Sequence, residues 1–370
     1  MEMLQLKKDQ VYHKLKKDIL SGELSSGKKL LSEPELAKKL SVGRVTLRAS
    51  LGRLEDEGYI TRINGKGTFV SPEPENHVSD GMIMIVHAAE SGIESVWHYI
   101  VPGIVKNAEE RNLDAFTTTN TAFEMFSDFE IKTFVQKNKV IGIVAVMCNF
   151  TGNELILPKL RVAKVPVVIT NSRAGDSEIT GFAGIGMDEK NGWEVAIAYL
   201  AESGHKNIGI IGNTSKSGFR SHSKQEILDC LSRNHAIPDE RLIKISPFDK
   251  EMVKAKVNEL FDSLPHPTAI LCYSDFYAIY VYEALKEMNL RIPEDVAVMG
   301  TCGYPDARLL SPPLSTIDYR YTKMAETAVT MLQTTKEWFD PVTGLGMLRI
   351  QPFQIRKRQS TECTKIKIKQ

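Results

Sequence analysis

The sequence has little cysteine, and its cysteines are not spaced like those of a metal site or a disulfide framework. Five occur in 370 residues, without CxxC spacing and without a histidine at metal-ligand distance: Cys148, Cys230, Cys272, Cys302 and Cys363. Isolated cysteines of this kind are usually small buried apolar residues or free thiols. We therefore expect no metal site and a protein of the reducing cytoplasm.

Membrane and export signals are lacking too. The sequence begins without the apolar stretch of a signal peptide, and no apolar run approaches the roughly 20 residues that span a bilayer. This argues against a free-standing solute-binding protein, which would have to be exported.

Common enzyme motifs are also missing. No GxGxxG or GxxxxGK[ST] loop follows an expected strand, and neither a GxSxG elbow nor an HExxH motif occurs. The glycine-rich residues 181–186 have the wrong order for a dinucleotide loop. We expect no catalytic residues and no cofactor, so a sugar-processing enzyme is only a remote alternative.

Charge is distributed unevenly along a chain whose net charge is only +1. Residues 1–70 carry 14 lysines and arginines against 9 acidic residues, and residues 356–370 carry 6 against 1. The middle of the chain must therefore be acidic. Such asymmetry is typical of a nucleic-acid-binding segment joined to a neutral or acidic body.

Residues 32–56 have the pattern of a helix-turn-helix. Ser32 is a favourable N-cap, and Glu35 completes a capping box three residues later. After a turn at 41–43, a second helix carries leucines at four- and three-residue steps, namely Leu47, Leu51 and Leu54. Arg44, Thr46 and Arg48 lie off this stripe at the helix start, as in a helix that reads DNA.

A hairpin is expected directly after these helices. Residues 59–63 and 68–70 are rich in β-branched and aromatic side chains, and Asn64-Gly65-Lys66-Gly67 between them suits a tight turn. A hairpin in this place is the wing of a winged helix, with Lys66 at its tip.

The N-terminal region resembles the GntR-type winged helix, and the match covers about 60 residues. The shared residues include Tyr12, Leu24, Gly27, Glu33, Leu36, Arg44, Thr46, Arg48, Glu57, Gly58 and the run Gly65–Val70. Ser26, Leu31 and Gly43 depart from the family pattern, and Gly43 lacks a hydroxyl that could contact a phosphate. The resemblance implies sequence-specific binding to double-stranded DNA.

The predicted DNA contacts divide into two kinds. Arg44 and Arg48 are candidates for base readout, because a guanidinium can bind guanine O6 and N7 together. The others, which would position the head on the backbone or touch base edges, are Ser32, Glu33, Thr46, Gly65, Lys66 and Gly67. The alternatives are a solvated basic helix face, a Ser32 that only caps its helix and a solvated hairpin tip.

A linker and an α/β body follow. Residues 71–80 are proline-rich, polar and without periodicity, which is typical of a linker. From residue 81, short apolar runs alternate with amphipathic patterns, which predicts parallel sheets covered by helices, and the expected strand runs include 82–86, 140–146 and 269–272. The number of such units predicts two similar lobes.

The body resembles that of LacI/GalR repressors, which have the type I periplasmic-binding-protein fold. The matching stretches are Asp188–Gly192, Gly204–Ile208, Ala269–Asp275, Ile292–Gly300 and Ser311–Ile317. The resemblance implies two lobes joined by three crossovers, with an effector between them. It places 81–187 and 301–319 in lobe one, and 188–300 and 320–355 in lobe two, within an effector and dimerisation domain spanning 81–370.

Six residues are candidates for binding the effector. Asp275 follows a buried strand, where its carboxylate could accept two sugar hydroxyls or instead cap the next helix. Tyr273 and Phe276 flank it and could wall the cleft. The resemblance adds Arg220, although the Gly-aromatic pair that follows this arginine in the family is missing here. Arg173 and Trp97 are expected near the cleft, Trp97 either stacking on a sugar or packing in the core.

These observations predict a cytoplasmic, homodimeric transcription factor, more often a repressor in both families, that binds operator DNA under control of a sugar. The arrangement is similar to that of arabinose repressors. One expected acidic contact is replaced at 300–304, so a purine-like or other non-sugar co-repressor is the alternative. The effector, the operator, the target genes, the sign of regulation and any oligomer beyond the dimer are not specified by the sequence.

Overall fold

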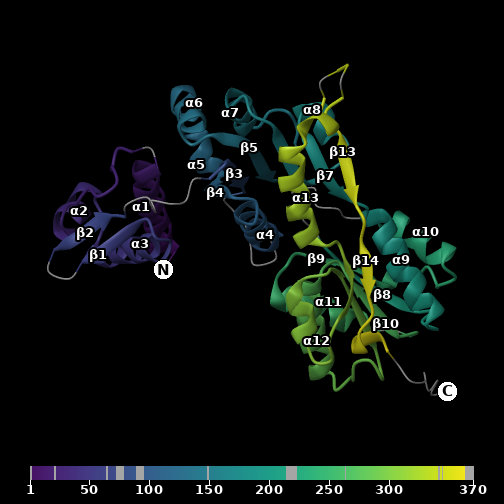
Figure 1. Ribbon diagram of the computed structural model, residues 1–370. Helices are drawn as coiled ribbons and strands as arrows, with labels where there is room; N and C mark the ends of the chain where they lie inside the picture. Colours follow the sequence, from purple (N-terminus) through teal and green to yellow (C-terminus); the bar gives the residue numbers. More distant parts are fainter. Residues whose placement is uncertain are drawn as a thin grey trace.

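A computed structural model describes residues 2–20, 22–63, 66–71, 79–88, 96–147, 150–213, 223–262, 264–340, 342–343 and 345–362. Figure 1 shows a small head formed by the first 70 residues beside a body of two lobes. No helix in these ranges is long and apolar enough to cross a membrane.

The head is a winged helix, as predicted. Helices α1 (Glu2–Leu20), α2 (Glu33–Lys39) and α3 (Arg44–Asp56) precede the antiparallel hairpin of β1 (Ile60–Ile63) and β2 (Gly67–Val70). The predicted stripe of α3 is its buried face, since Leu47, Leu51 and Leu54 are at most 1% exposed. They pack against Val11, Tyr12 and Leu15 of α1, which closes the core.

Lobe one is a six-stranded, all-parallel sheet in the order β13-β7-β6-β5-β3-β4. Its strands are β3 (Gly81–His87), β4 (Leu113–Thr119), β5 (Val140–Val146), β6 (Val167–Ser172), β7 (Ala183–Met187) and β13 (Leu348–Gln351). Its helices are α4 (Trp97–Glu109), α5 (Asn120–Glu124), α6 (Asp128–Lys137), α7 (Ile156–Val162), α8 (Asp176–Thr180) and α13 (Tyr321–Gln333). Ile83 and Ile85 belong to the apolar cluster of α4 and α13, whereas Met82 and Met84 belong to that of α6 and α7, so both faces of the sheet are covered.

Lobe two has the strand order β14-β12-β11-β10-β8-β9, antiparallel only at β14. Its strands are β8 (Ile208–Asn213), β9 (Ile243–Ser246), β10 (Ala269–Cys272), β11 (Ala297–Cys302), β12 (Ser315–Asp318) and β14 (Gln354–Arg356). Its helices are α9 (Glu189–Glu202), α10 (Lys224–Arg233), α11 (Lys250–Glu259) and α12 (Asp275–Glu287), with short 3-10 turns at Glu240–Leu242, Pro305–Leu309 and Gln359–Thr361.

Three crossovers join the lobes, at β7 to α9, β12 to α13 and β13 to β14. They correct the predicted division of the C-terminal half. Residues 315–318 form β12, which pairs with β11, so the 301–319 segment belongs to lobe two and not to lobe one. Conversely, α13 and β13 lie in lobe one, although 320–355 was assigned to lobe two. Helix α13 was not predicted from the sequence; its Met324, Ala328 and Leu332 are buried beside α4.

Candidate DNA-reading surface and effector site

The start of α3 presents an exposed surface on the head. Arg44 and Arg48 are exposed, as predicted, and so is Val45 (78%), which the sequence analysis did not single out. The predicted DNA contact of Thr46 is wrong, because this side chain is only 6% exposed and cannot reach DNA from this position. It lies on the side of α3 that packs against α1, where Ser50 Oγ donates to the Lys8 carbonyl at 2.7 Å and has the Thr46 carbonyl 3.0 Å away.

Two of the predicted contact residues meet each other. Arg48 Nε lies 2.7 Å from Glu33 Oε2, and both side chains reach solvent. Ser32 is part of the predicted capping box, since its backbone N–H and its hydroxyl both donate to Glu35 Oε2, at 3.0 and 2.6 Å. These hydrogen bonds from Ser32 lower the pKa of Glu35. The box fixes the start of α2, from which Glu33 reaches α3.

The wing brings further positive charge beside α3. Lys66 and Gly67 are exposed, and Gly67 has a φ of +114°, a value that glycine tolerates. Gly65 lies outside the described residues. Arg62 of β1 was not predicted, yet its Nη2 donates to the Arg48 carbonyl at 3.4 Å and its Nε pairs with Glu55 at 3.3 Å. Only the pairing of the hairpin with the helix reveals this neighbour of the reading helix.

In the body, the crossovers show which sheet edges face each other. Strand β7 of lobe one ends at Met187 and leads directly into α9 of lobe two. In the opposite direction, β12 of lobe two ends at Asp318 and leads into α13 of lobe one. The carboxyl edges of both sheets therefore point toward the neighbouring lobe, which is where α/β folds bind small molecules.

Asp275 stands at this edge but is engaged within the protein. It is 3% exposed; its Oδ1 accepts the Thr316 hydroxyl at 2.6 Å and its Oδ2 accepts the Tyr304 N–H at 2.7 Å. Burial raises the pKa of Asp275 to about 7. Both oxygens therefore accept protein donors in this structure, and the binding of two sugar hydroxyls by this carboxylate stays a prediction. Asp275 thus links the start of α12 to the start of the segment that connects β11 and β12.

Aromatic side chains gather where the two edges meet. Trp97, at the start of α4, stacks on His87 with ring centroids 4.5 Å apart and on His98 at 4.0 Å. Burial lowers the pKa of His87, which favours a neutral ring. Trp97 is half-buried and packs against the core, which is its alternative role, and its stacking on a sugar stays a prediction.

The lobes contact each other through tyrosines. Tyr99 of α4 stacks on Tyr304 of lobe two at 4.6 Å, and its hydroxyl donates to Asp306 at 3.2 Å. Tyr321, which begins α13, stacks on the same Tyr304 at 5.6 Å. Phe276 lies 4.9 Å from Tyr304 in a tilted arrangement. Lobe one thus contacts one tyrosine of lobe two from two helices.

The remaining effector candidates are spread more widely. Tyr273 is half-buried after β10 and contacts Tyr277 edge-on at 6.0 Å. Arg173 follows β6 at the carboxyl edge of lobe one, where its backbone N–H donates to Asp176 Oδ2 at 2.8 Å. Arg220 lies outside the described residues. Among the residues that the structure describes, no cluster of three metal-ligating side chains occurs.

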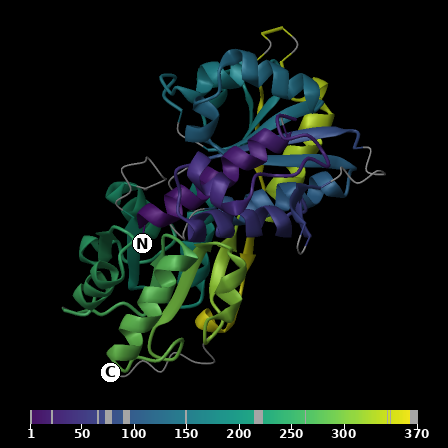
Figure 2. The same ribbon diagram turned by 90° about the vertical axis from the view of Figure 1, so that its left-hand side faces the viewer.

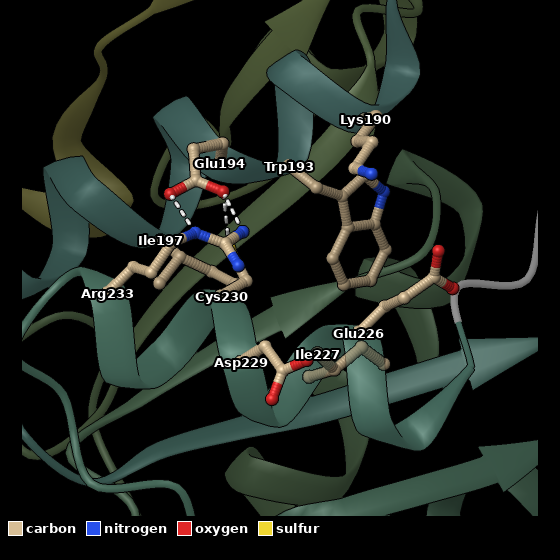
Figure 3. Close-up of a pocket in the computed structure, with 9 residues that line it drawn as sticks. All are labelled: Lys190, Trp193, Glu194, Ile197, Glu226, Ile227, Asp229, Cys230 and Arg233. Atoms are coloured by element: carbon tan, nitrogen blue, oxygen red, sulfur yellow. Dashed lines mark hydrogen bonds and ion pairs between the residues drawn. The ribbon is translucent and has the colours of Figure 1, made fainter.

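A pocket lies between α9 and α10 of lobe two (Figure 3). It encloses about 470 Å³, counting the part open to solvent. Arg233 and Glu194 form an ion pair of 2.5 Å at its side, and Glu194 also accepts from Asn234. Cys230 is buried in its wall with its pKa raised to about 12 by burial, which makes the thiol unreactive.

Comparison with known proteins gives two matches to family descriptions. Residues 7–70 match "Bacterial regulatory proteins, gntR family", and residues 197–361 match "Periplasmic binding protein-like domain". An arabinose metabolism transcriptional repressor of Geobacillus stearothermophilus is 27% identical over 87% of this chain and 90% of its own length.

A further relative and a solved structure are also regulators by their descriptions. The HTH-type transcriptional repressor PurR of Actinobacillus pleuropneumoniae is 25% identical over 53% of this chain and 57% of its own length. A crystal structure of a LacI family transcriptional regulator from Enterococcus faecium with bound ribose superposes with a TM-score of 0.56, covering 75% of this chain and 98% of that one at 16% identity. At that identity the likeness supports the fold.

Proposed function

We propose that this chain, which joins a DNA-binding domain of the bacterial gntR family to a periplasmic-binding-protein-like domain, is a transcriptional repressor controlled by a sugar bound between its lobes. One observation carries the proposal. The exposed Arg44, Val45 and Arg48 of a winged helix stand on the same chain as two sheets whose carboxyl edges face each other.

The proposed mechanism uses the three crossovers as the hinge. A sugar that contacts both carboxyl edges binds more tightly when the lobes are closed, so it shifts the population toward that angle. In a homodimer in the cytoplasm, the change of angle alters the spacing of two heads that read a pseudo-palindromic operator. Coupling is reciprocal, so operator DNA weakens sugar binding by the same factor.

The test begins by selecting duplexes from a random pool with the full-length protein. The selected operator is then used in a shift assay at fixed salt, titrated with pentoses and hexoses. We expect one sugar to lower operator affinity at least about fivefold, the lower end of typical coupling. Selection of no consensus would refute the DNA-reading role, whereas a consensus without any sugar response would refute the effector class.

A purine-like co-repressor is the second candidate, because both Asp275 oxygens are engaged and the lobes meet through aromatic rings. Flat heterocycles stack well on such rings. A thermal-shift screen of the full chain distinguishes the two, since a ligand stabilises the state that it binds. Stabilisation by nucleobases but by no sugar would reverse the order of the two candidates.

A further inference from the structure

The DNA-binding head contacts lobe one directly, besides being joined to it by the linker. Lys17 of α1 places its Nζ 2.7 Å from Glu130 Oε1 of α6 and 4.5 Å from the centre of the Phe126 ring. The hydrogen bond from Lys17 lowers the pKa of Glu130 to about 2. An ion pair and a cation–π contact thus share one ammonium group.

A second contact joins the head to the far end of α6. Gly22 follows α1, and Nζ of Lys137, the last residue of α6, lies so close to it that a Cβ on Gly22 would clash with the ammonium. The ammonium of Lys137 is therefore close to the C-terminal end of α1, where the helix dipole is negative. With two contacts at separate points, the head is held against α6 in both position and direction.

The contact leaves the reading surface free. Helix α1 packs on the side of α3 that carries Ser50, whereas Arg44, Val45 and Arg48 are exposed. In Figure 1, α1 lies on the side of the head nearest the body and the β1–β2 hairpin lies on the far side. Figure 2 shows the head from that far side, in front of the body. The contact with lobe one therefore leaves the DNA-reading surface of the head accessible.

Glu130 is itself fixed within lobe one. Its Oε2 accepts from the backbone N–H and the hydroxyl of Ser127, at 2.8 and 2.9 Å, in a capping box at the start of α6. Because the carboxylate is held by its own helix, a force on Lys17 is passed to α6 and to the sheet that α6 covers.

We propose that Lys17 and Glu130 form a salt-sensitive clasp that makes the head move with lobe one, so that a change of lobe angle reaches the DNA-reading surface. The proposal rests on the proposed function, since it describes how effector binding is transmitted. Both side chains are partly exposed, at 37% and 43%, so the pair is weak and reversible. Without it, the approach of Lys137 to Gly22 and the linker near 71–80 would still join head and body, but less of a change in lobe angle would reach the head.

The test uses the full-length protein, its selected operator and a responsive sugar or nucleobase. The measured quantity is the response ratio, the larger of the two operator Kd values, with and without effector, divided by the smaller. Glu130→Gln keeps the capping box but removes the charge, and it lies outside the DNA-binding head. We expect this variant and Lys17→Gln each to reduce the response ratio about two- to fivefold at low salt, with no further loss in the double variant.

Two controls separate the clasp from general charge effects. Asp128→Asn removes a carboxylate from the same helix, where it pairs with Lys159 at 3.0 Å, and should keep the full ratio. Lys14→Gln removes one lysine from α1 and should weaken all DNA binding slightly while keeping the ratio.

Small-angle scattering should show a larger radius of gyration for Glu130→Gln than for Asp128→Asn. A wild-type protein that responds, with Glu130→Gln responding equally and equally compact, would overturn the clasp. A wild type without any response would instead refute the proposed function.

Discussion

Arg48 and Glu33 form an ion pair of 2.7 Å between the two helices of the reading head. Arg48 remains 68% exposed, so its guanidinium can still approach a base edge while Glu33 limits its rotamers. Since the pair is at the surface, its own contribution to stability is small, at most about 1 kcal/mol. The main effect of the ion pair is to orient the Arg48 guanidinium.

Replacing Arg48 by alanine should cost about 1–3 kcal/mol of binding to the selected operator and relax preference at one base position. Glu33→Gln should instead strengthen binding to unrelated duplexes, because it removes a negative charge near phosphates. The difference in affinity between the operator and random DNA should therefore become smaller. Competition shift assays at one salt concentration measure both effects. Lys39→Ala, on the last turn of α2, is the control, and equal loss of preference in that variant would contradict a specific role for Arg48.

Lys66→Ala should weaken binding to every duplex by a similar factor. Its ammonium stands on the exposed wing, where a phosphate contact releases one counterion. The slope of log K against log salt should therefore become shallower by about 0.9. An unchanged slope with a changed base preference would show that Lys66 reads bases instead.

The head should lose stability when Glu57 is replaced by glutamine. Glu57 Oε2 accepts from Tyr12 Oη at 2.5 Å and from the buried Lys16 ammonium at 2.9 Å, which ties α1 to the end of α3. Burial raises the pKa of Tyr12 to about 12, so the hydroxyl remains a donor. We expect a loss of about 1–2 kcal/mol, because Lys16 keeps its charge without its carboxylate and Glu57 is partly open to solvent.

Hydrogen exchange measured by mass spectrometry over residues 8–20 and 44–57 reports this loss directly, as faster exchange in Glu57→Gln. Asp56→Asn, which alters the exposed neighbour, should leave the exchange within about 0.5 kcal/mol of the wild type. Equal exchange in all three proteins would mean that the network does not stabilise the head.

Asp275 should make the body less stable as the pH rises. Its folded-state pKa of about 7 lies above the value of 3.8 for an unperturbed aspartate, so the folded protein holds a proton that the unfolded chain has released. The stabilisation is complete below about pH 4 and is lost as the pH rises to about 7. Thermal unfolding of the full chain from pH 5 to 8 should show this slope in the wild type.

The Asp275→Asn variant should lose that part of the slope, because an amide side chain does not titrate in this range, even though its unfolding temperature is lower throughout. The slope and not the absolute temperature is the readout, because asparagine can accept only one of the two hydrogen bonds from Tyr304 and Thr316 well. The same slope in both proteins would assign the pH dependence to other groups.

The sequence predicted the head well because its signals are local. The capping box at Ser32, the leucine stripe of α3 and the antiparallel pairing that closes from Ile63 to Gly67 each depend on residues close in sequence, and the structure has all three. Thr46 was misplaced because the stripe was read as a line of leucines. The buried face of α3 is wider, and it includes Thr46 and Ser50 because α1 covers them.

The body was predicted less completely for the opposite reason. Strands with apolar runs such as 140–146 were recognised, but β12, β13 and α13 were not, since their neighbours are far away in the sequence. Two C-terminal segments were predicted in the wrong lobes, which shows the limit of a family resemblance. Which sheet a short strand joins depends on hydrogen-bond partners that no local pattern contains.

By itself, the sequence determined that a basic winged helix precedes an α/β body, because capping, turn chemistry and helical periodicity are properties of neighbouring residues. The tertiary structure alone decided that Asp275 is enclosed by Tyr304 and Thr316, that Arg62 adjoins Arg48 and that Lys17 meets Glu130. These pairs are separated by 14 to 113 residues. Only the packing of whole elements brings such groups within the few ångströms over which hydrogen bonds and ion pairs act.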